Sequence, residues 1–211
     1  MFKISLKLDL EEFAKNMTDL QKTQVPFTAQ LTINELAYRL SQTVVKDSMS
    51  KSFDKGATRW SRGASRYTQS RSKKDLRATV YLKGDRPYMR NLIDGGIVSP
   101  LDGMSRLIQP ITNNYKVNKY GNVPRNTLKR LASNKKTYFY GRPGNKKENT
   151  YGLYKRPTKK GGKFKLLIKV EENFRTQKAF WNPTKESEKY VHRRFTMTFN
   201  KHFNKVMKTA R

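Results

Sequence analysis

The chain has no cysteine, only two histidines and only 16 acidic residues among its 211. Without cysteine it can form neither disulfide bonds nor thiolate metal sites. His192 and His202 lie in a segment with helical spacing, where ten residues of helix separate them by about 15 Å. Two histidines this far apart do not share a metal ion, so the sequence predicts no metal site and no cofactor.

Long apolar runs are also missing. No run approaches the roughly 18 residues that a membrane-spanning helix needs. The first residues, Met1 to Leu6, lack the apolar stretch of a secretory signal. We therefore expect a soluble protein made in the cytoplasm, without contact to a membrane. Its 11 Phe, 11 Tyr and 2 Trp supply bulky core material, which favours a folded chain.

Catalytic motifs are absent as well: the chain has no nucleophile elbow, no phosphate-binding P-loop lysine and no dinucleotide fingerprint. A metal-dependent nuclease would need clustered carboxylates to hold its ions. The candidates are few, and all but the first lie in turns where aspartate is common: Asp75, Asp85, Asp94 and Asp102. We expect that the protein is not an enzyme.

Positive charge is what the chain has in excess, and this charge is unevenly distributed. The formal net charge is +30, yet residues 1–50 and 87–115 are each balanced. Residues 51–86 carry 11 basic against 3 acidic side chains, and residues 116–169 carry 17 against 1. Such an excess destabilises the compact state unless anions lie nearby. Its concentration in two stretches predicts a surface for a polyanion, for which the phosphate backbone of nucleic acid is the obvious partner.

The first 50 residues read as a strand followed by helices. Apolar and polar residues alternate over 2–8, and helical spacing follows over 9–20. Pro26 is expected to interrupt or kink this helix before a second one over 29–47. The apolar stripe of the second helix indicates either core or a subunit contact. We assign its oligomer-interface residues as Ile33, Leu36, Leu40 and Val44.

Residues 51–170 are expected to form a β-rich body with long basic loops. The polar stretch 48–75 indicates a loop that becomes ordered on meeting a partner. Strands are predicted over 78–82, 137–140 and 164–170, the last two as a hairpin-type pair in an antiparallel sheet.

Residues 171–211 end in a helix, because Asn182 and Pro183 provide a cap and a first helical residue before apolar residues at helical spacing. The whole chain, 1–211, is expected to be a single domain of the α+β class.

Basic residues in the two charged stretches are the candidate polyanion site. Trp60 and Tyr67 lie among those of the first stretch, where they either stack on exposed bases or anchor the loop to the body. The second stretch shows no clear helical pattern, and sequence-specific reading of the major groove usually uses a helix. Contact with the DNA backbone, without sequence preference, is therefore favoured. The candidate DNA-facing residues are Arg59, Arg62, Arg66, Arg71, Lys73, Lys74, Lys135, Lys136, Arg142, Lys146, Lys147, Lys155, Arg156, Lys159, Lys160 and Lys163.

Three groups of short motifs resemble a known family. The first is the segment 24–30, Gln-Val-Pro-Phe-Thr-Ala-Gln, which runs into a helix with Asn34 and Ala37. The second is Ser52-Phe53, followed by Thr58-Arg59-Trp60 and the strand 76–80. The third consists of Tyr88, Leu92–Gly96, Leu107–Pro110, Asn118–Asn122 and Gly152–Arg156. Together they resemble the tail-completion and neck proteins of tailed bacteriophages, of the type of minor tail protein Z of phage lambda.

The resemblance implies a virion protein at the head–tail junction, made in the bacterial host cytoplasm. It implies a homo-oligomeric ring around the DNA channel, in contact with other neck, tail or portal-adaptor proteins. The charge pattern agrees, since basic loops would face double-stranded DNA and the neutral segments would supply subunit contacts.

Three alternatives remain open from the sequence. One is a non-specific nucleic-acid-binding protein of the nucleoid- or ribosome-associated type, which the composition fits equally well. Another is a nuclease, which the shortage of carboxylates disfavours. The third is a virion protein located elsewhere, in the capsid interior or among ejected proteins.

Overall fold

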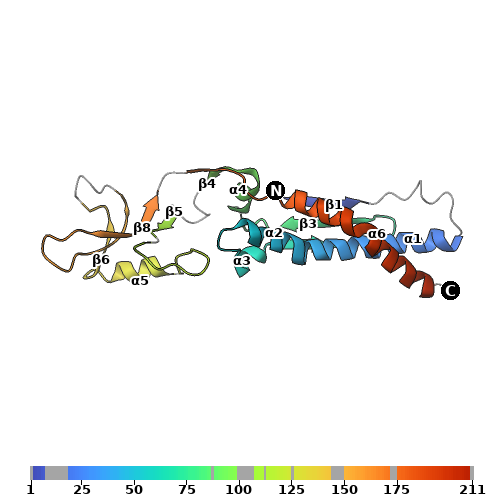
Figure 1. Ribbon diagram of the computed structural model, residues 1–211, viewed down its shortest axis with the longest axis horizontal. Coiled ribbons are helices and arrows are strands. Elements are labelled where there is room, and N and C mark those ends of the chain that lie inside the picture. The colour runs from blue at the N-terminus through green and yellow to red at the C-terminus, as the bar shows by residue number, and fades with distance from the viewer. Residues whose placement is uncertain are drawn as a thin grey trace. The chain divides into compact units, whose positions relative to one another are not determined.

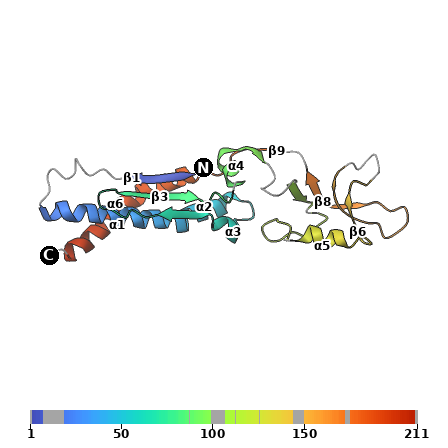
Figure 2. The same cartoon turned by 180° about the vertical axis from the view of Figure 1, so that it is seen from behind.

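The computed structural model describes residues 2–7, 19–86, 88–98, 107–111, 113–124, 126–143, 150–171 and 175–209. The chain folds into two compact units, shown in Figures 1 and 2. Unit 1 comprises Met1–Asp94 and Ala179–Arg211, and unit 2 comprises Gly95–Lys178. Helices and antiparallel sheets are both present, so the predicted α+β class is confirmed. The stretch 51–170, expected as one β-rich body, is instead divided between the two units.

Unit 1 has one three-stranded antiparallel sheet in the order β1-β3-β2. Its strands are β1 (Lys3–Lys7), β2 (Ser65–Thr68) and β3 (Arg77–Leu82). The predicted alternation is observed, because Ile4 lies opposite Val80 while Lys3 and Lys7 on β1 are exposed. On β3, Ala78 and Val80 are completely buried, which places this face of the sheet in the core.

Helices complete unit 1. A continuous helical run consists of α1 (Asp19–Arg39), the π-helical turn η2 (Leu40–Val44) and α2 (Val45–Ser52). It is followed by the short helices α3 (Arg59–Arg62) and α4 (Tyr88–Asp94). Pro26 lies inside α1, so the helix is not interrupted there. Val25 directly before it and Ala29 three residues after it are buried, and their packing offsets the hydrogen bond that proline cannot make.

The C-terminal helix α6 (Pro183–Thr209) packs against α1, with which it runs side by side in Figures 1 and 2. As predicted, Asn182 caps it: its Oδ1 accepts a hydrogen bond from the backbone N–H of Lys185 at 3.0 Å. Trp181, directly before this cap, is 2% exposed and belongs to the core.

The four residues assigned to an oligomer interface lie in the interior of unit 1. Ile33, Leu36 and Leu40 are 2%, 1% and 0% exposed, and the partly buried Val44 packs against the same core. The interface assignment is therefore wrong for this stripe. Helical spacing of apolar residues indicates that one face of a helix is buried, but not what buries it. Here the sheet and α6 of the same chain pack against this face.

Unit 2 contains a four-stranded antiparallel sheet in the order β5-β8-β7-β6. Its strands are β5 (Leu107–Pro110), β6 (Tyr138–Gly141), β7 (Gly152–Lys155) and β8 (Lys165–Glu171). The helix α5 (Thr127–Ser133) contributes Leu131 to a small core with Leu153 and Ile168. A separate pair of strands, β4 (Gly96–Val98) and β9 (Arg175–Gln177), completes the unit.

The strands predicted over 137–140 and 164–170 correspond to β6 and β8, but they do not pair with each other. β7 lies between them and pairs with both. The predicted hairpin is therefore replaced by a meander of three strands, and the loop that was expected to join β6 to β8 contains this middle strand.

Candidate nucleic-acid interface

The candidate basic residues of unit 1 fall into two groups. Arg59, Arg62 and Arg66 belong to α3 and β2, whereas Arg71, Lys73 and Lys74 lie in the loop between β2 and β3. Arg62 lies near Asp47 of α2, and the ammonium of Lys73 lies 4.8 Å from the ring centre of Phe27 in α1. These two contact points are 20 residues apart in one helical run, which corresponds to about 30 Å. The first basic stretch thus extends over about 30 Å along this helical run.

The loop between β2 and β3 is attached to α1 by side-chain hydrogen bonds. The amide of Asn34 donates to the carbonyl of Ser70 at 3.0 Å and accepts from its N–H at 2.8 Å. Gln30 donates to the same carbonyl at 3.1 Å. The hydroxyl of Ser70, which is 5% exposed, donates to backbone carbonyls within the loop. The prediction that 48–75 is a loop awaiting a partner is therefore wrong, because α3, β2 and these bonds order it.

Trp60 and Tyr67 make aromatic contacts that anchor this stretch. Trp60 stacks on Tyr88 with ring centres 5.5 Å apart, and the guanidinium of Arg86 lies 4.6 Å from its ring centre. The ring of Tyr67 meets that of Tyr38 edge to face at 5.7 Å. Trp60 nevertheless stays 52% exposed, so it forms part of the surface as well.

Part of the second basic stretch gathers at one end of the four-stranded sheet of unit 2. Lys155 lies opposite Tyr138 of β6 on one side and opposite Lys165 of β8 on the other. The start of β6, the end of β7 and the start of β8 therefore share one end of the sheet. Exposed basic residues of these strand ends and their loops form what we call the basic end: Lys135, Lys136, Lys155, Arg156, Lys159, Lys160, Lys163 and Lys165.

Arg156 connects the parts of the basic end. Its guanidinium lies 5.4 Å from the ring centre of Phe139 and 6.0 Å from that of Phe164. Its Nε donates to the carbonyl of Lys135 at 3.0 Å, and its backbone N–H donates to the carbonyl of Thr137 at 2.8 Å. Arg156 was predicted to face DNA, but these contacts give it a structural role, because they attach the turn before β6 to the end of β7.

The basic end carries uncompensated charge. Like charges directly opposite one another on neighbouring strands destabilise a sheet, and Lys155 and Lys165 form such a pair. Among the residues that the structure describes in unit 2, Glu171 is the sole carboxylate, and it pairs with Lys169. Glu171 ends β8, whereas Lys165 begins it. An anion bound at the basic end would relieve this repulsion.

The remaining predicted residues of unit 2 lie elsewhere. Arg142 directly follows β6, whose first residue, Tyr138, marks the basic end, so Arg142 belongs to the opposite end of the sheet. Lys146 and Lys147 fall outside the described residues. The lysine-rich stretch that looks continuous in the sequence is thus distributed over both ends of the sheet.

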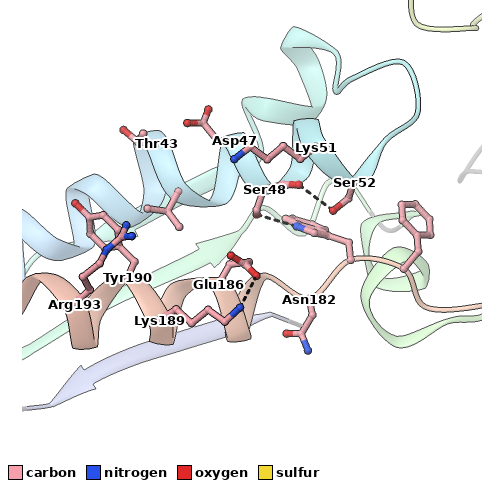
Figure 3. A pocket seen from close by; sticks show the side chains of 13 residues that line it. Thr43, Asp47, Ser48, Lys51, Ser52, Asn182, Glu186, Lys189, Tyr190 and Arg193 are labelled. Atoms are coloured by element: carbon pink, nitrogen blue, oxygen red, sulfur yellow. Dashed lines mark hydrogen bonds and ion pairs between the residues drawn. The ribbon is translucent and has the colours of Figure 1, made fainter.

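Unit 1 also has a groove of about 750 Å³ between α2 and the start of α6, drawn in Figure 3. Asp47, Lys51, Glu186 and Lys189 give it mixed charge. The hydroxyl of Ser48 on its wall accepts a hydrogen bond from the indole N–H of Trp181 at 3.0 Å and donates to a backbone carbonyl of its own helix. Ser48 is therefore a structural residue of this groove rather than a nucleophile beside a base.

Neither histidine belongs to a metal site in the described part of the chain, where no group of three or more His, Asp or Glu side chains could hold a metal ion. His202 instead lies 2.8 Å from the carboxylate of Glu35, which also accepts a hydrogen bond from Lys201 at 2.8 Å. The helices of the described residues include none long and apolar enough to cross a membrane.

No known protein family, curated protein or solved structure matches the chain. The geometry of the basic end is therefore the main basis for a functional interpretation.

Proposed function

We propose that the protein is a structural, non-catalytic component of a tailed-bacteriophage virion, of the tail-completion or neck type, and that its basic end contacts the DNA backbone. The observation that carries the DNA-binding part is the basic end itself: eight exposed cations, with two lysines directly opposite one another. Nucleic acid supplies a dense row of phosphates to such a surface, with release of counterions.

The geometry favours contact with phosphates over reading of base sequence. The basic end consists of strand ends, the turn between α5 and β6 and the loop between β7 and β8. Sequence-specific reading of the major groove usually uses a helix that presents arginine or amide side chains at fixed positions. The helix of this unit, α5, has seven residues and uses Leu131 for the core. Lysine, the main residue of the basic end, binds phosphate as a point charge.

The virion assignment depends on the resemblance to tail-completion and neck proteins. In that setting several copies would form a ring around the DNA channel, with portal-adaptor or tail proteins as neighbours. Since the stripe on α1 and η2 is buried, the ring would need other contacts. Exposed apolar side chains of unit 1 are the candidates: Tyr38, Phe180 and Met197, with 50%, 44% and 55% exposure.

The DNA-binding part is tested by salt-dependent affinity for a short duplex. A variant with Lys135, Lys136, Lys159 and Lys160 replaced by Gln is expected to bind more weakly. Its log–log salt slope should decrease by roughly 0.9 for each phosphate that the variant no longer neutralises. A matched control replaces four exposed lysines of α6 with Gln: Lys185, Lys189, Lys205 and Lys208. Equal slopes for the first variant and the unmodified protein would exclude the basic end as the DNA surface.

The virion part is tested by the mass of the protein in solution across salt concentrations, with and without the duplex. A monomer that forms a ring of defined mass only with DNA or an acidic partner would support a neck protein. Progressive coating of DNA without fixed stoichiometry would favour a nucleoid- or ribosome-associated type. Stable rings at low salt without any anion would contradict the need for a compensating partner, since copies carrying +30 repel one another.

A further inference from the structure

Two arginines from different elements of unit 1, Arg62 of α3 and Arg66 of β2, are close enough to Lys46 of α2 for their charges to act on its ammonium group. α3 packs against α2, and Nη2 of Arg62 lies 3.9 Å from Oδ1 of Asp47, the residue next to Lys46. β2 packs against η2, the turn that directly precedes α2. Tertiary packing, and not adjacency in the sequence, therefore brings these cations together.

Lys46 is held in this position. Its ammonium donates a hydrogen bond to the side-chain carbonyl of Gln42, one helical turn earlier, at 2.6 Å. Burial lowers the pKa of Lys46, and the neighbouring charges of Arg62 and Arg66 lower it further. Asp47 offsets this repulsion only in part, because it and Arg62 are both about half exposed and their contact is long.

We infer that Lys46, Arg62 and Arg66 form an oxyanion site in unit 1 that binds a single phosphate group. Arginine presents a planar fork of donors that matches a phosphate, and lysine adds a point charge. The inference does not depend on the proposed function, because the basic end belongs to unit 2 and shares no residue with this site. A phosphate here would offset the repulsion that Arg62 and Arg66 exert on Lys46.

The site is tested by NMR of the arginine Nε–Hε groups of the full chain, with inorganic phosphate exchanged for chloride at constant ionic strength. The signals of Arg62 and Arg66 are expected to shift saturably. Lys46→Gln should weaken the affinity about 10-fold, as expected for loss of one charged hydrogen bond. Lys205→Gln, which removes an equal charge from α6, should leave it unchanged. Shifts that grow linearly without saturation, or equal affinity in Lys46→Gln, would overturn the inference.

A second variant distinguishes the loss of a phosphate contact from a loss of folded structure. Arg62 is half exposed, so Arg62→Gln should fold normally and lose phosphate affinity to a similar degree. In phosphate-free buffer, Lys46→Gln should melt at or above the temperature of the unmodified protein, because it removes repulsion between like charges. A clearly lower melting temperature together with unchanged phosphate affinity would show that Lys46 serves packing alone, and would overturn the inference.

The phosphate group can belong to a DNA backbone or to a small phosphorylated molecule. A short duplex that shifts the Arg62 and Arg66 signals and displaces inorganic phosphate would identify the backbone as the source. Saturable phosphate binding without any response to the duplex would support the site and assign it to a small ligand. Either result is independent of the salt slopes measured for the basic end. The phosphate site of unit 1 and DNA contact at the basic end of unit 2 can therefore be refuted separately.

Discussion

Lys155 on β7 lies directly opposite Lys165 on β8, and both side chains are exposed. A sheet that evolved for stability alone would not place two ammonium groups across from each other, since like pairs in this position are destabilising. The pair therefore connects the stability of unit 2 with the anion binding proposed for it, and the two properties can be separated by reversing one charge.

Lys165→Glu replaces the like pair with an opposite pair. The free energy of unfolding should rise by roughly 0.2–1 kcal/mol, the usual range for a favourable cross-strand pair, while the affinity for DNA falls. Urea denaturation and fluorescence anisotropy with a short duplex measure the two effects. Lys163→Glu is the matched control: it changes the charge equally but lies in the loop before β8, so it should lower affinity without raising stability.

Asn34→Ala should release the loop between β2 and β3. The substitution removes both hydrogen bonds from Asn34 to the backbone of Ser70. The Ser70 carbonyl keeps its hydrogen bond from Gln30, but the Ser70 N–H loses its partner, which costs roughly 1–3 kcal/mol of stability. Hydrogen exchange at Ser70 should accelerate more than elsewhere in unit 1. Asn34→Asp keeps the acceptor for the Ser70 N–H and should give an intermediate effect. Unchanged exchange at Ser70 would show that the loop is held by other contacts.

Glu35 should make the stability of unit 1 depend on pH. The hydrogen bond from Lys201 is the largest cause that holds the pKa of this carboxyl below its ordinary value, and the bond to His202 adds to it against the opposing effect of burial. A lowered pKa in the folded state means that the stabilisation is complete above the unfolded value, about 4.3, and is lost as the pH falls through the folded pKa. Glu35→Gln should therefore be less stable than the unmodified protein at neutral pH.

The difference in free energy of unfolding between Glu35→Gln and the unmodified protein should shrink as the pH is lowered below about 4.3. Denaturant unfolding at a series of pH values measures this difference. Glu186→Gln provides the comparison, because Glu186 is about half exposed and forms a 3.6 Å ion pair with Lys189 on the same helix. A constant difference for Glu35→Gln down to the lowest pH would contradict the role of the charged carboxylate.

Arg156→Lys separates charge from structure at the basic end. Lysine keeps the charge but loses the planar contact with Phe139 and Phe164 and the hydrogen bond from Nε to Lys135. Unit 2 should become less stable by about 1 kcal/mol, whereas the salt slope for DNA should change little. Unchanged stability would show that these contacts of Arg156 do not hold the basic end together.

Elements with a clear apolar pattern could be predicted from the sequence. β1 and β3 alternate because one face meets the core and the other does not, and α6 begins at the predicted cap, Asn182. β7 could not be found in this way. Its Gly152, Leu153 and Tyr154 are all buried, so the strand shows no alternation and is too short to stand out.

The sequence did not predict, for a different reason, that residues 48–75 are ordered by contacts within the chain. This order depends on contacts between polar groups far apart in the chain, such as Asn34 with Ser70, and these produce no periodic pattern. The apolar stripe on the second predicted helix was recognised correctly as a buried face. The sequence could not show whether the same chain or another copy covers it.

The sequence could predict that the candidate site is rich in lysine and arginine, but not which of these residues lie beside one another. Strand register places Lys155 beside Lys165, while it separates Arg142 from both. Lys46 was overlooked because it belongs to the balanced segment 1–50, where it gives no local excess of charge. Only the packing of α3 and β2 around α2 makes it a neighbour of arginines.

The way unit 2 is inserted into unit 1 has a consequence for synthesis on the ribosome. The chain leaves unit 1 after α4 and returns next to it, where the carbonyl of Leu92 accepts hydrogen bonds from the N–H groups of both Phe180 and Trp181 at 3.1 Å. α6 is therefore translated only after the whole of unit 2. During that interval the buried face of α1 lacks its helical cover. Unit 2 can reach its own fold first, and unit 1 is completed last, when α6 docks.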